Sequence, residues 1–313
     1  MKKISIIIPV YYNEENLLAL YADLKEKVLN ILPKYNLNYE IVMVDDGSKD
    51  NSYNMMQDIA KIDENIILVK LTRNFGEHAA TLAGLSVCTG NFAVRKAADL
   101  QEPSELILQM IDKYLEGNKV VLATRKNRHD KWHEILLSKI YTKTIKELAL
   151  PNMPDGGFDS YLIDRQVIDF LVNLNQKNSP LTELILWSGF EYVTIDYERQ
   201  KRLAGKSRWT LSKKIKMTFD SLLGFSYLPI RFITSTGILV FFFSIIWIII
   251  LIFQKLMGKI TIDGYTSIII LILVSFSIIM LSLGIIGEYI WRTLDESKKT
   301  PAFIIDYIKK NNK

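Results

Sequence analysis

Acidic residues that follow apolar runs carry the first chemical signal in this sequence. Asp45 and Asp46 come directly after the run Tyr39–Val44, and Asp99 follows the weaker strand-like run Phe92–Ala97. Carboxylates can accept hydrogen bonds from the N–H groups of a base or from ribose hydroxyls, and hard divalent cations take oxygen ligands. These acids therefore predict a site that binds a nucleotide together with a metal ion.

The elements that must position these acids alternate along the chain. Apolar runs bounded by turn residues predict strands, and helical spacing of apolar residues predicts helices. Their alternation predicts an α/β fold, a mostly parallel, doubly wound sheet with helices on both faces. The predicted strands are Ile4–Val10, Tyr39–Val44, Ile66–Leu71, Phe92–Ala97 and Val120–Ala123, and the predicted helices are Glu14–Leu32, Asp50–Ile62, Glu77–Val87 and Glu105–Glu116.

Polar residues fall at the carboxyl ends of these predicted strands. Tyr12 and Glu14 follow the first strand, Asp45 the second, Arg73 the third and Asp99 the fourth. In open parallel sheets, ligands bind in the crevice outside the carboxyl ends of the strands. We therefore expect one site that is assembled from four loops.

Composition indicates a reducing compartment and a membrane surface. The chain has a single cysteine, Cys88, and a formal net charge of +5. One cysteine excludes an internal disulfide and suits the cytosol. The positive excess is modest and gathers between Lys206 and Arg231, so the expected partner is a membrane rather than a nucleic acid.

Two long apolar segments predict a transmembrane hairpin. Phe232–Phe253 and Thr266–Gly287 carry no charged residue, and each has about 22 residues, or about 33 Å of helix against a hydrocarbon core of roughly 30 Å. Basic residues precede the first segment and follow the second, while the connector has only Lys255 and Lys259, so the positive-inside rule places both ends in the cytoplasm. Residues 210–225 predict an amphipathic helix, either in the membrane interface or packed on the soluble domain.

Four motifs along the chain carry a family resemblance. They are Pro9-Val10-Tyr11-Tyr12-Asn13-Glu14-Glu15, Val44-Asp45-Asp46-Gly47-Ser48, Arg73-Asn74-Phe75-Gly76 and Ala98-Asp99-Leu100-Gln101-Glu102-Pro103. Together they resemble the family 2 glycosyltransferases. More narrowly, they resemble the polyprenyl-phosphate glycosyltransferases, which include dolichyl-phosphate mannose synthases and bactoprenol glucosyltransferases. The resemblance covers nearly the whole chain, because those bacterial enzymes also end in two membrane spans.

The resemblance implies a GT-A, Rossmann-like fold and a multi-pass protein of the bacterial inner membrane. We expect a cytoplasmic glycosyltransferase domain in residues 1–209, an amphipathic juxtamembrane region in 210–230, two transmembrane helices in 231–290 and a cytoplasmic tail in 291–313. Gly284 and Gly287 could allow close helix packing, which leaves a homo-oligomer possible.

The implied reaction is the inverting transfer of a hexose to a polyprenyl phosphate such as undecaprenyl phosphate, for modification of cell-envelope glycans. UDP-glucose is the first expectation for the donor, and UDP-linked N-acetylhexosamines and GDP-mannose stay open. Asp46 could instead shape its turn or cap the following helix, and His78 could serve at a helix start. The expected nucleotide-binding residues are Pro9, Tyr12, Glu14, Asp45, Asp46, Arg73, Asn74, His78 and Ala98.

The metal site departs from the family pattern. The resemblance implies that Asp99 is catalytic and binds Mg²⁺ or Mn²⁺, with Gln101 as a further ligand. The family's usual text is Asp-Ala-Asp-Leu-Gln, whereas this chain has Ala97 in place of the first acid. We expect the loss of a carboxylate to weaken metal binding. Arg95 or Lys96 could replace part of the metal's charge if its side chain turned toward the diphosphate.

The acceptor side must attract a second anion. A lipid phosphate carries about 1.5 to 2 negative charges near neutral pH, and arginine's planar fork suits phosphate oxygens. The stretch from Arg199 to Trp209 resembles the family's phosphate-binding loop, although a surface arginine is often only a solvated charge. The expected acceptor-binding residues are Arg125, Arg128, Arg199, Arg202, Ser207 and Arg208.

Asp159 resembles the acid of the family's Gly-Asp-Phe segment and is the second expected catalytic residue. A phosphate oxygen is already ionised, so the acceptor needs no strong base. Asp159 could orient an arginine or bind a sugar hydroxyl instead.

Two other functions stay open from the sequence. A processive polysaccharide synthase usually has a Gln-x-x-Arg-Trp motif and more membrane spans, whereas here Gly205 stands at the position of that glutamine. A catalytically weak membrane scaffold has Ala97 as its support.

Overall fold

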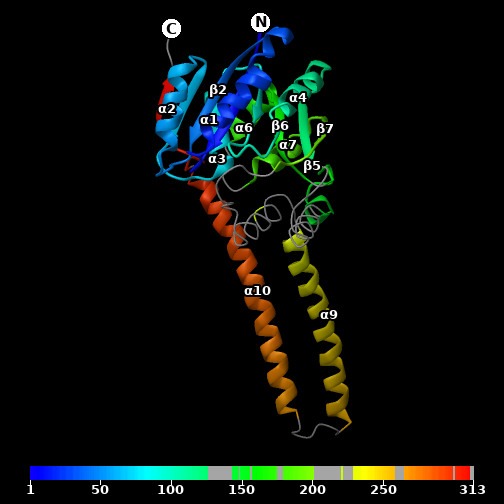
Figure 1. Cartoon of the computed structure of the whole chain (residues 1–313). Coiled ribbons are helices and arrows are strands. Elements are labelled where there is room, and N and C mark those ends of the chain that lie inside the picture. Colours follow the sequence, from blue (N-terminus) through cyan, green and yellow to red (C-terminus); the bar gives the residue numbers. More distant parts are fainter. Residues whose placement is uncertain are drawn as a thin grey trace. The chain divides into compact units, whose positions relative to one another are not determined.

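The chain forms two compact units in a computed structural model (Figure 1). The first unit comprises Met1–Ser221 and Pro301–Lys313, and the second comprises Leu222–Thr300. The described residues are 1–125, 143–147, 149–155, 157–174, 179–200, 220, 228–257, 264–298 and 300–310.

The first unit is built on an eight-stranded sheet in the order β7-β5-β6-β4-β1-β2-β3-β8. Strand β1 pairs in parallel with β2 and β4, β2 with β3, and β5 with β7. Two strands run the other way, β6 between β4 and β5, and β8 against β3. The expected mostly parallel sheet is confirmed. The strands are β1 Lys2–Val10, β2 Leu37–Asp45, β3 Ile66–Leu71, β4 Phe92–Arg95, β5 Val120–Arg125, β6 Phe158–Asp164, β7 Tyr192–Tyr197 and β8 Ile305–Lys310.

Helices cover both faces of this sheet, as the alternation predicts. Buried side chains of α1, α2 and α4 share one hydrophobic cluster with the sheet, while α3 packs on β1 and β2 and α6 packs on β4 and β6. The helices are α1 Leu17–Leu24, α2 Ser52–Ile62, α3 Glu77–Val87, α4 Leu106–Leu115, α6 Arg165–Leu174 and α7 Leu181–Trp187.

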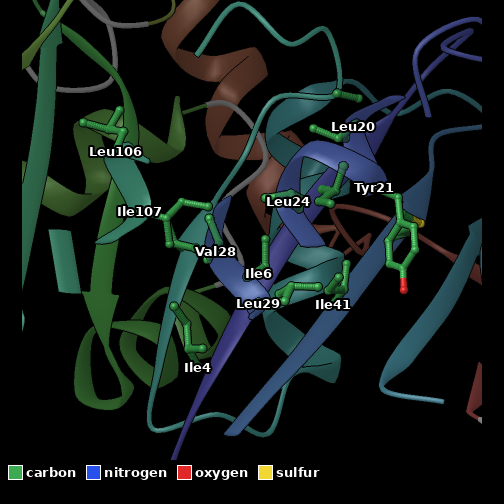
Figure 2. Packing of buried hydrophobic residues seen from close by; sticks show 14 of the residues in the cluster. Ile4, Ile6, Leu20, Tyr21, Leu24, Val28, Leu29, Ile41, Leu106 and Ile107 are labelled. Atoms are coloured by element: carbon green, nitrogen blue, oxygen red, sulfur yellow. The ribbon is translucent and has the colours of Figure 1, made fainter. Parts of the chain in front are cut away.

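Strand β1 is buried on both faces of the sheet, and its successive side chains point alternately to one face and the other. Ile6 lies in the cluster with Leu24 of α1 and Val28 of the next turn, as Figure 2 shows. Ile7 points to the opposite face, where α3 approaches so closely that a Cβ on Gly84 would lie 2.5 Å from Ile7 Cγ2. A strand that is buried on both faces therefore needs a continuous apolar run, and a glycine lets the helix lie against it.

The differences from the predicted elements concern helix ends and non-local strands. The predicted helix Glu14–Leu32 is α1 followed by a π-helical turn at Lys25–Leu29 and a 3-10 turn at Leu32–Tyr35. The sequence predicts no strand for the segments of β6, β7 and β8. Strand β8 pairs with β3 across most of the chain's length, and no local pattern reports such a partner.

The second unit contains two long helices, α9 Leu228–Leu256 and α10 Tyr265–Ser297, of 29 and 33 residues. They contain the two apolar segments that the sequence predicts as helices. Among the described residues, one stretch, Val274–Asp295, meets a length and hydropathy criterion for a membrane span. Most of the predicted amphipathic segment 210–225 lies outside the described residues.

Candidate active site

The loop after β1 is held in a strained conformation against the loop after β2. Tyr12 has a φ of 55°, which is uncommon for a residue with a side chain. Its N–H donates to Ser48 Oγ at 3.1 Å, and the N–H of Asn13 donates to Ser52 Oγ at 2.9 Å. Glu14 accepts a hydrogen bond from the N–H of Asn51 at 2.7 Å. Glu14 thus holds the two loops together, and Pro9 lies just before them in β1, where it pairs with Val44.

Asp45 is a fully buried carboxylate with one oxygen still available. Its Oδ1 accepts a hydrogen bond from the N–H of Ser48 at 3.1 Å, whereas its buried Oδ2 has no hydrogen-bond partner among the described residues. Burial raises the pKa of Asp45 above its ordinary value. Because an unsatisfied buried acceptor is costly, Oδ2 marks a place where a ligand's N–H or O–H would be bound.

Asp46 holds the loop between β3 and α3. Its two oxygens accept hydrogen bonds from the N–H groups of Phe75 and Gly76, at 2.7 and 2.9 Å. A Cβ on Gly47 would lie 2.6 Å from the backbone carbon of Arg73, so the two loops touch at the backbone. Arg73 and Asn74 are exposed on this loop, and the Arg73 guanidinium lies 4.7 Å from the centroid of the Phe75 ring.

The proton equilibrium of Asp46 gives a prediction that pH can test. Burial raises its pKa from 3.8 to about 6, so at intermediate pH the folded chain keeps a proton that the unfolded chain releases. The contribution of Asp46 to the free energy of unfolding is therefore complete below pH 3.8, and it is lost as the pH rises through 6. We expect the melting temperature of the wild type, relative to Asp46→Asn, to fall as the pH rises from about 5 to about 7.

Intrinsic fluorescence of the full chain in detergent measures this difference. Asp58→Asn is the control, because Asp58 is an exposed residue of α2 that pairs with Lys61 at the surface. A difference between wild type and Asp46→Asn that stays constant over this range would contradict the prediction.

Asp99 lies in a tight loop after β4. Asp99 Oδ1 accepts a hydrogen bond from the N–H of Gln101 at 3.2 Å, and Leu100 between them has a φ of 59°. Ala98 is buried beneath this loop, and Ala97 is half-buried where the family pattern has its first acid. Gln101 contacts a distant segment, because its side-chain oxygen accepts a hydrogen bond from Arg199.

The donor set around Asp99 limits how a cation could be held. Divalent Mg²⁺ and Ca²⁺ take about six or more oxygen ligands. Among the described residues, no group of three or more His, Cys, Asp or Glu side chains could hold a metal. Glu102 uses its two oxygens on Arg95 and on the N–H of Ala97. The residues therefore fit a cation that takes most of its ligands from a bound diphosphate, with Asp99 as the protein carboxylate.

Arg95 and Lys96 are both held by groups of the protein. Arg95 forms ion pairs with Glu77 and Glu102. Lys96 is buried and donates to the carbonyl oxygen of Glu102, and burial lowers its pKa. In the conformation seen here, both cations are therefore engaged by groups of the protein.

The antiparallel direction of β6 brings a second acid to the same end of the sheet. Arg125 ends β5 and forms an ion pair with Asp159 near the start of β6. Ser160 Oγ donates to the carbonyl oxygen of Arg95 at 2.9 Å, so Asp159 lies beside the loop that carries Asp99. Tyr197 is buried near this pair, and burial raises the pKa of Tyr197 to about 12.

His78 lies at the start of α3, next to this group. Its Nδ1 accepts a hydrogen bond from the N–H of Leu181 at 3.4 Å, while its Nε2 is buried without a partner among the described residues. Burial lowers the pKa of His78, and the charges of Glu77, Arg95 and Asp159 act on it as well. The imidazole is therefore neutral near pH 7 and keeps its proton on Nε2, since Nδ1 is the acceptor.

The structure thus gathers most of the expected site residues at one end of the sheet. Among the expected acceptor-binding residues, Arg125 and Arg199 reach this region, while Arg128, Arg202, Ser207 and Arg208 lie outside the described residues. Sequence reasoning missed Glu77, Glu102 and Tyr197. Glu77 and Glu102 stood inside or beside recognised motifs, but only the fold shows that both contact Arg95.

Comparison with known proteins gives a consistent result. The family model described as Glycosyl transferase family 2 matches residues 5–171. The Bacillus subtilis glycosyltransferase YkcC is 35% identical over 96% of this chain and 92% of its own length. The bactoprenol glucosyl transferase of Shigella phage SfV is 30% identical, over 97% of this chain and 98% of its own. The undecaprenyl-phosphate 4-deoxy-4-formamido-L-arabinose transferase of Proteus mirabilis is 28% identical, over 100% and 97%.

Proposed function

Because the chain belongs to glycosyl transferase family 2, we propose that it transfers a hexose from a nucleotide sugar to a polyprenyl phosphate. The chain is a glycosyltransferase, and the two substrates are the proposal. Relatives named for bactoprenol and undecaprenyl phosphate, matched along nearly their whole lengths, support the acceptor. Glucose in the name of the phage relative supports UDP-glucose as the first donor to test.

The observation that carries the donor side is the buried Asp45 carboxylate with its unpartnered Oδ2. A base N–H or a ribose hydroxyl would satisfy that oxygen. Tyr12 and the loop around Arg73 and Asn74 lie at the same strand ends, which supports a role for them in contacting the rest of the nucleoside. The diphosphate would then extend toward Asp99.

A divalent cation bound by Asp99 and the diphosphate would neutralise the charge that develops on the leaving nucleoside diphosphate. Mg²⁺ and Mn²⁺ both accept such oxygen ligands. Asp99 would hold the cation, with Gln101 as a further ligand; the Gln101 side-chain oxygen also accepts a hydrogen bond from Arg199.

The acceptor side is supported by the ion pair between Arg125 and Asp159. A phosphate oxygen of the acceptor attacks the anomeric carbon from the side opposite the nucleoside diphosphate. The new C–O bond forms as the bond to the diphosphate breaks, so the configuration inverts. The attacking oxygen is already ionised, and Asp159 therefore acts by orienting Arg125 toward the phosphate rather than by removing a proton.

The chain's connectivity supports a membrane hairpin made of α9 and α10. Strand β8 follows α10 in the chain, yet it pairs with β3 in the sheet of the first unit. A chain that leaves one side of a membrane and returns to the same folded unit must cross an even number of times. Two spans and a catalytic domain in the cytoplasm of a bacterial cell satisfy this condition.

Incubation of the detergent-purified chain with radiolabelled UDP-glucose and undecaprenyl phosphate tests the proposed function. We expect a lipid-linked monosaccharide, and we expect EDTA to stop its formation and added Mn²⁺ or Mg²⁺ to restore it. Parallel reactions with UDP-N-acetylglucosamine and GDP-mannose decide the sugar. No lipid-linked product with any donor would overturn the proposal, and full turnover in EDTA would remove the cation from it.

A further inference from the structure

Arg95 joins two segments that are separate in the sequence. It ends β4 and is only 9% exposed, so its guanidinium lies inside the first unit. Its Nη1 donates to Glu102 Oε1 at 2.7 Å, and its Nη2 pairs with Glu77. Glu77 belongs to the first turn of α3, and Glu102 follows the loop that carries Asp99.

The two ion pairs of Arg95 form a bridge between these segments. At its Glu102 end, Glu102 also makes hydrogen bonds within the loop that carries Asp99. Its Oε2 accepts a hydrogen bond from the N–H of Ala97 at 3.2 Å, and its carbonyl oxygen accepts one from Lys96. The carboxylate thus ties the start of the loop to its end. Ala97 stands where the family pattern has an acid, so a cation has one carboxylate fewer with which to order this loop. The hydrogen bonds of Glu102 within the loop order it instead.

On the other side, Glu77 continues the loop that Asp46 holds. Asp46 accepts hydrogen bonds from the N–H groups of Phe75 and Gly76, directly before Glu77. One guanidinium therefore connects the loop that carries Asp99 to the loop held by Asp46.

The charge of Arg95 is stabilised by the two carboxylates that it contacts. Burial lowers the pKa of Arg95, but the carboxylates of Glu77 and Glu102 raise it, and the net shift is upward. Arg95 is therefore charged in the folded chain. Removing the guanidinium would leave the buried Glu102 carboxylate without a compensating charge, so the Arg95–Glu102 pair is firmly held.

We propose that Arg95 is a positioning residue for the transfer reaction, which holds the Ala97–Gln101 loop against the start of α3 in the geometry that receives the diphosphate. The inference rests on the proposed function. A loop that is ordered before binding loses less conformational entropy when the nucleotide arrives, and affinity rises accordingly. Arg95 itself touches no substrate in this arrangement.

Three variants separate positioning from stability. Glu77→Gln weakens the arm to α3 and leaves the Arg95–Glu102 pair in place. Arg95→Lys keeps the charge but offers a single nitrogen, which cannot reproduce the fork. Arg95→Met removes the bridge and leaves two carboxylates unpaired, so this variant is also expected to melt at a lower temperature.

The readouts are the dissociation constant for UDP by calorimetry, with Mn²⁺ and with EDTA, and the KM and kcat for UDP-glucose. We expect about tenfold weaker UDP binding and a raised KM for Glu77→Gln and Arg95→Lys, at a melting temperature near that of the wild type. Glu116→Gln is the matched control, because it removes an exposed glutamate paired with Lys113 on α4. Measurements at a temperature well below each melting point keep stability out of the comparison.

Unchanged UDP affinity and KM in both Glu77→Gln and Arg95→Lys would overturn the inference and leave Arg95 a structural residue, even if Arg95→Met fails to fold. A wild type that binds neither UDP nor GDP would instead overturn the proposed function, and the positioning role with it. GDP and GDP-mannose replace UDP and UDP-glucose if the wild type binds only GDP.

Discussion

Asp99→Asn is expected to lower sugar transfer by at least about a hundredfold, because a metal-assisted leaving group contributes several kcal/mol to the transition state. Among the described residues, no cluster of acids could take over a cation, since Ala97 offers none and Glu102 is bound to Arg95. The asparagine keeps the shape of the side chain but loses its charge. Initial rates with a saturating donor and acceptor measure the effect.

Binding measurements show whether Asp99 acts through the cation. With Mn²⁺ present, we expect Asp99→Asn to bind UDP more weakly than the wild type, whereas in EDTA the two proteins should bind it equally. Asp58→Asn, an exposed change on α2, is the control and should match the wild type in both conditions. Turnover within a few-fold of the wild type would remove Asp99 from the catalytic residues.

Arg125→Met is expected to lower kcat/KM for undecaprenyl phosphate by about a hundredfold, because hydrogen bonds to a charged group contribute about 1.5–3 kcal/mol. Arg125 stands at the end of β5 and is fixed by Asp159, so its removal takes away an oriented cation on the proposed acceptor side. Nucleotide affinity should not change, since Asp45 and the Asp46 loop stay intact. This separates Arg125 from Asp99, whose loss affects the donor.

A double-mutant cycle tests the proposed role of Asp159. If Asp159 acts by orienting Arg125, then Asp159→Asn combined with Arg125→Met should cost little more than Arg125→Met alone. Lys113→Met, on the exposed face of α4, controls for the loss of a surface cation. Additive losses in the cycle would contradict the orienting role and would favour a separate function for Asp159, such as binding a sugar hydroxyl.

The sequence predicts the parallel core of the fold because each element of that core has a local pattern of apolar residues. Helices α2 and α3 and strand β3 end within two residues of their predicted bounds. Each of these elements buries an apolar run or stripe whose period is visible in the chain. Asp45, Asp46 and Asp99 follow parallel strands, and parallel strands all end at the same edge of the sheet. Their positions at one edge can therefore be predicted.

Long-range pairing decides the rest of the sheet. The position of Asp159 depends on β6 running antiparallel between β4 and β5, and a chain that looks regularly alternating gives no sign of that reversal. Strand β8 joins the sheet only after α9 and α10, so its partner β3 lies far back in the sequence. Strand periodicity reports which face of a strand is buried, and it carries no information about the neighbouring strand.

By itself, the sequence determined the α/β class, the family and the order of the motifs, because these depend on residue types and spacing along the chain. Only the tertiary structure decided what Arg95, Glu77 and Glu102 do. In sequence they are charged residues beside a weakened metal motif, and Arg95 could have faced a diphosphate. An unpaired buried charge is costly, so in the folded chain Arg95 pairs with both carboxylates. Arg95 therefore connects two loops and is no longer a candidate ligand of the diphosphate.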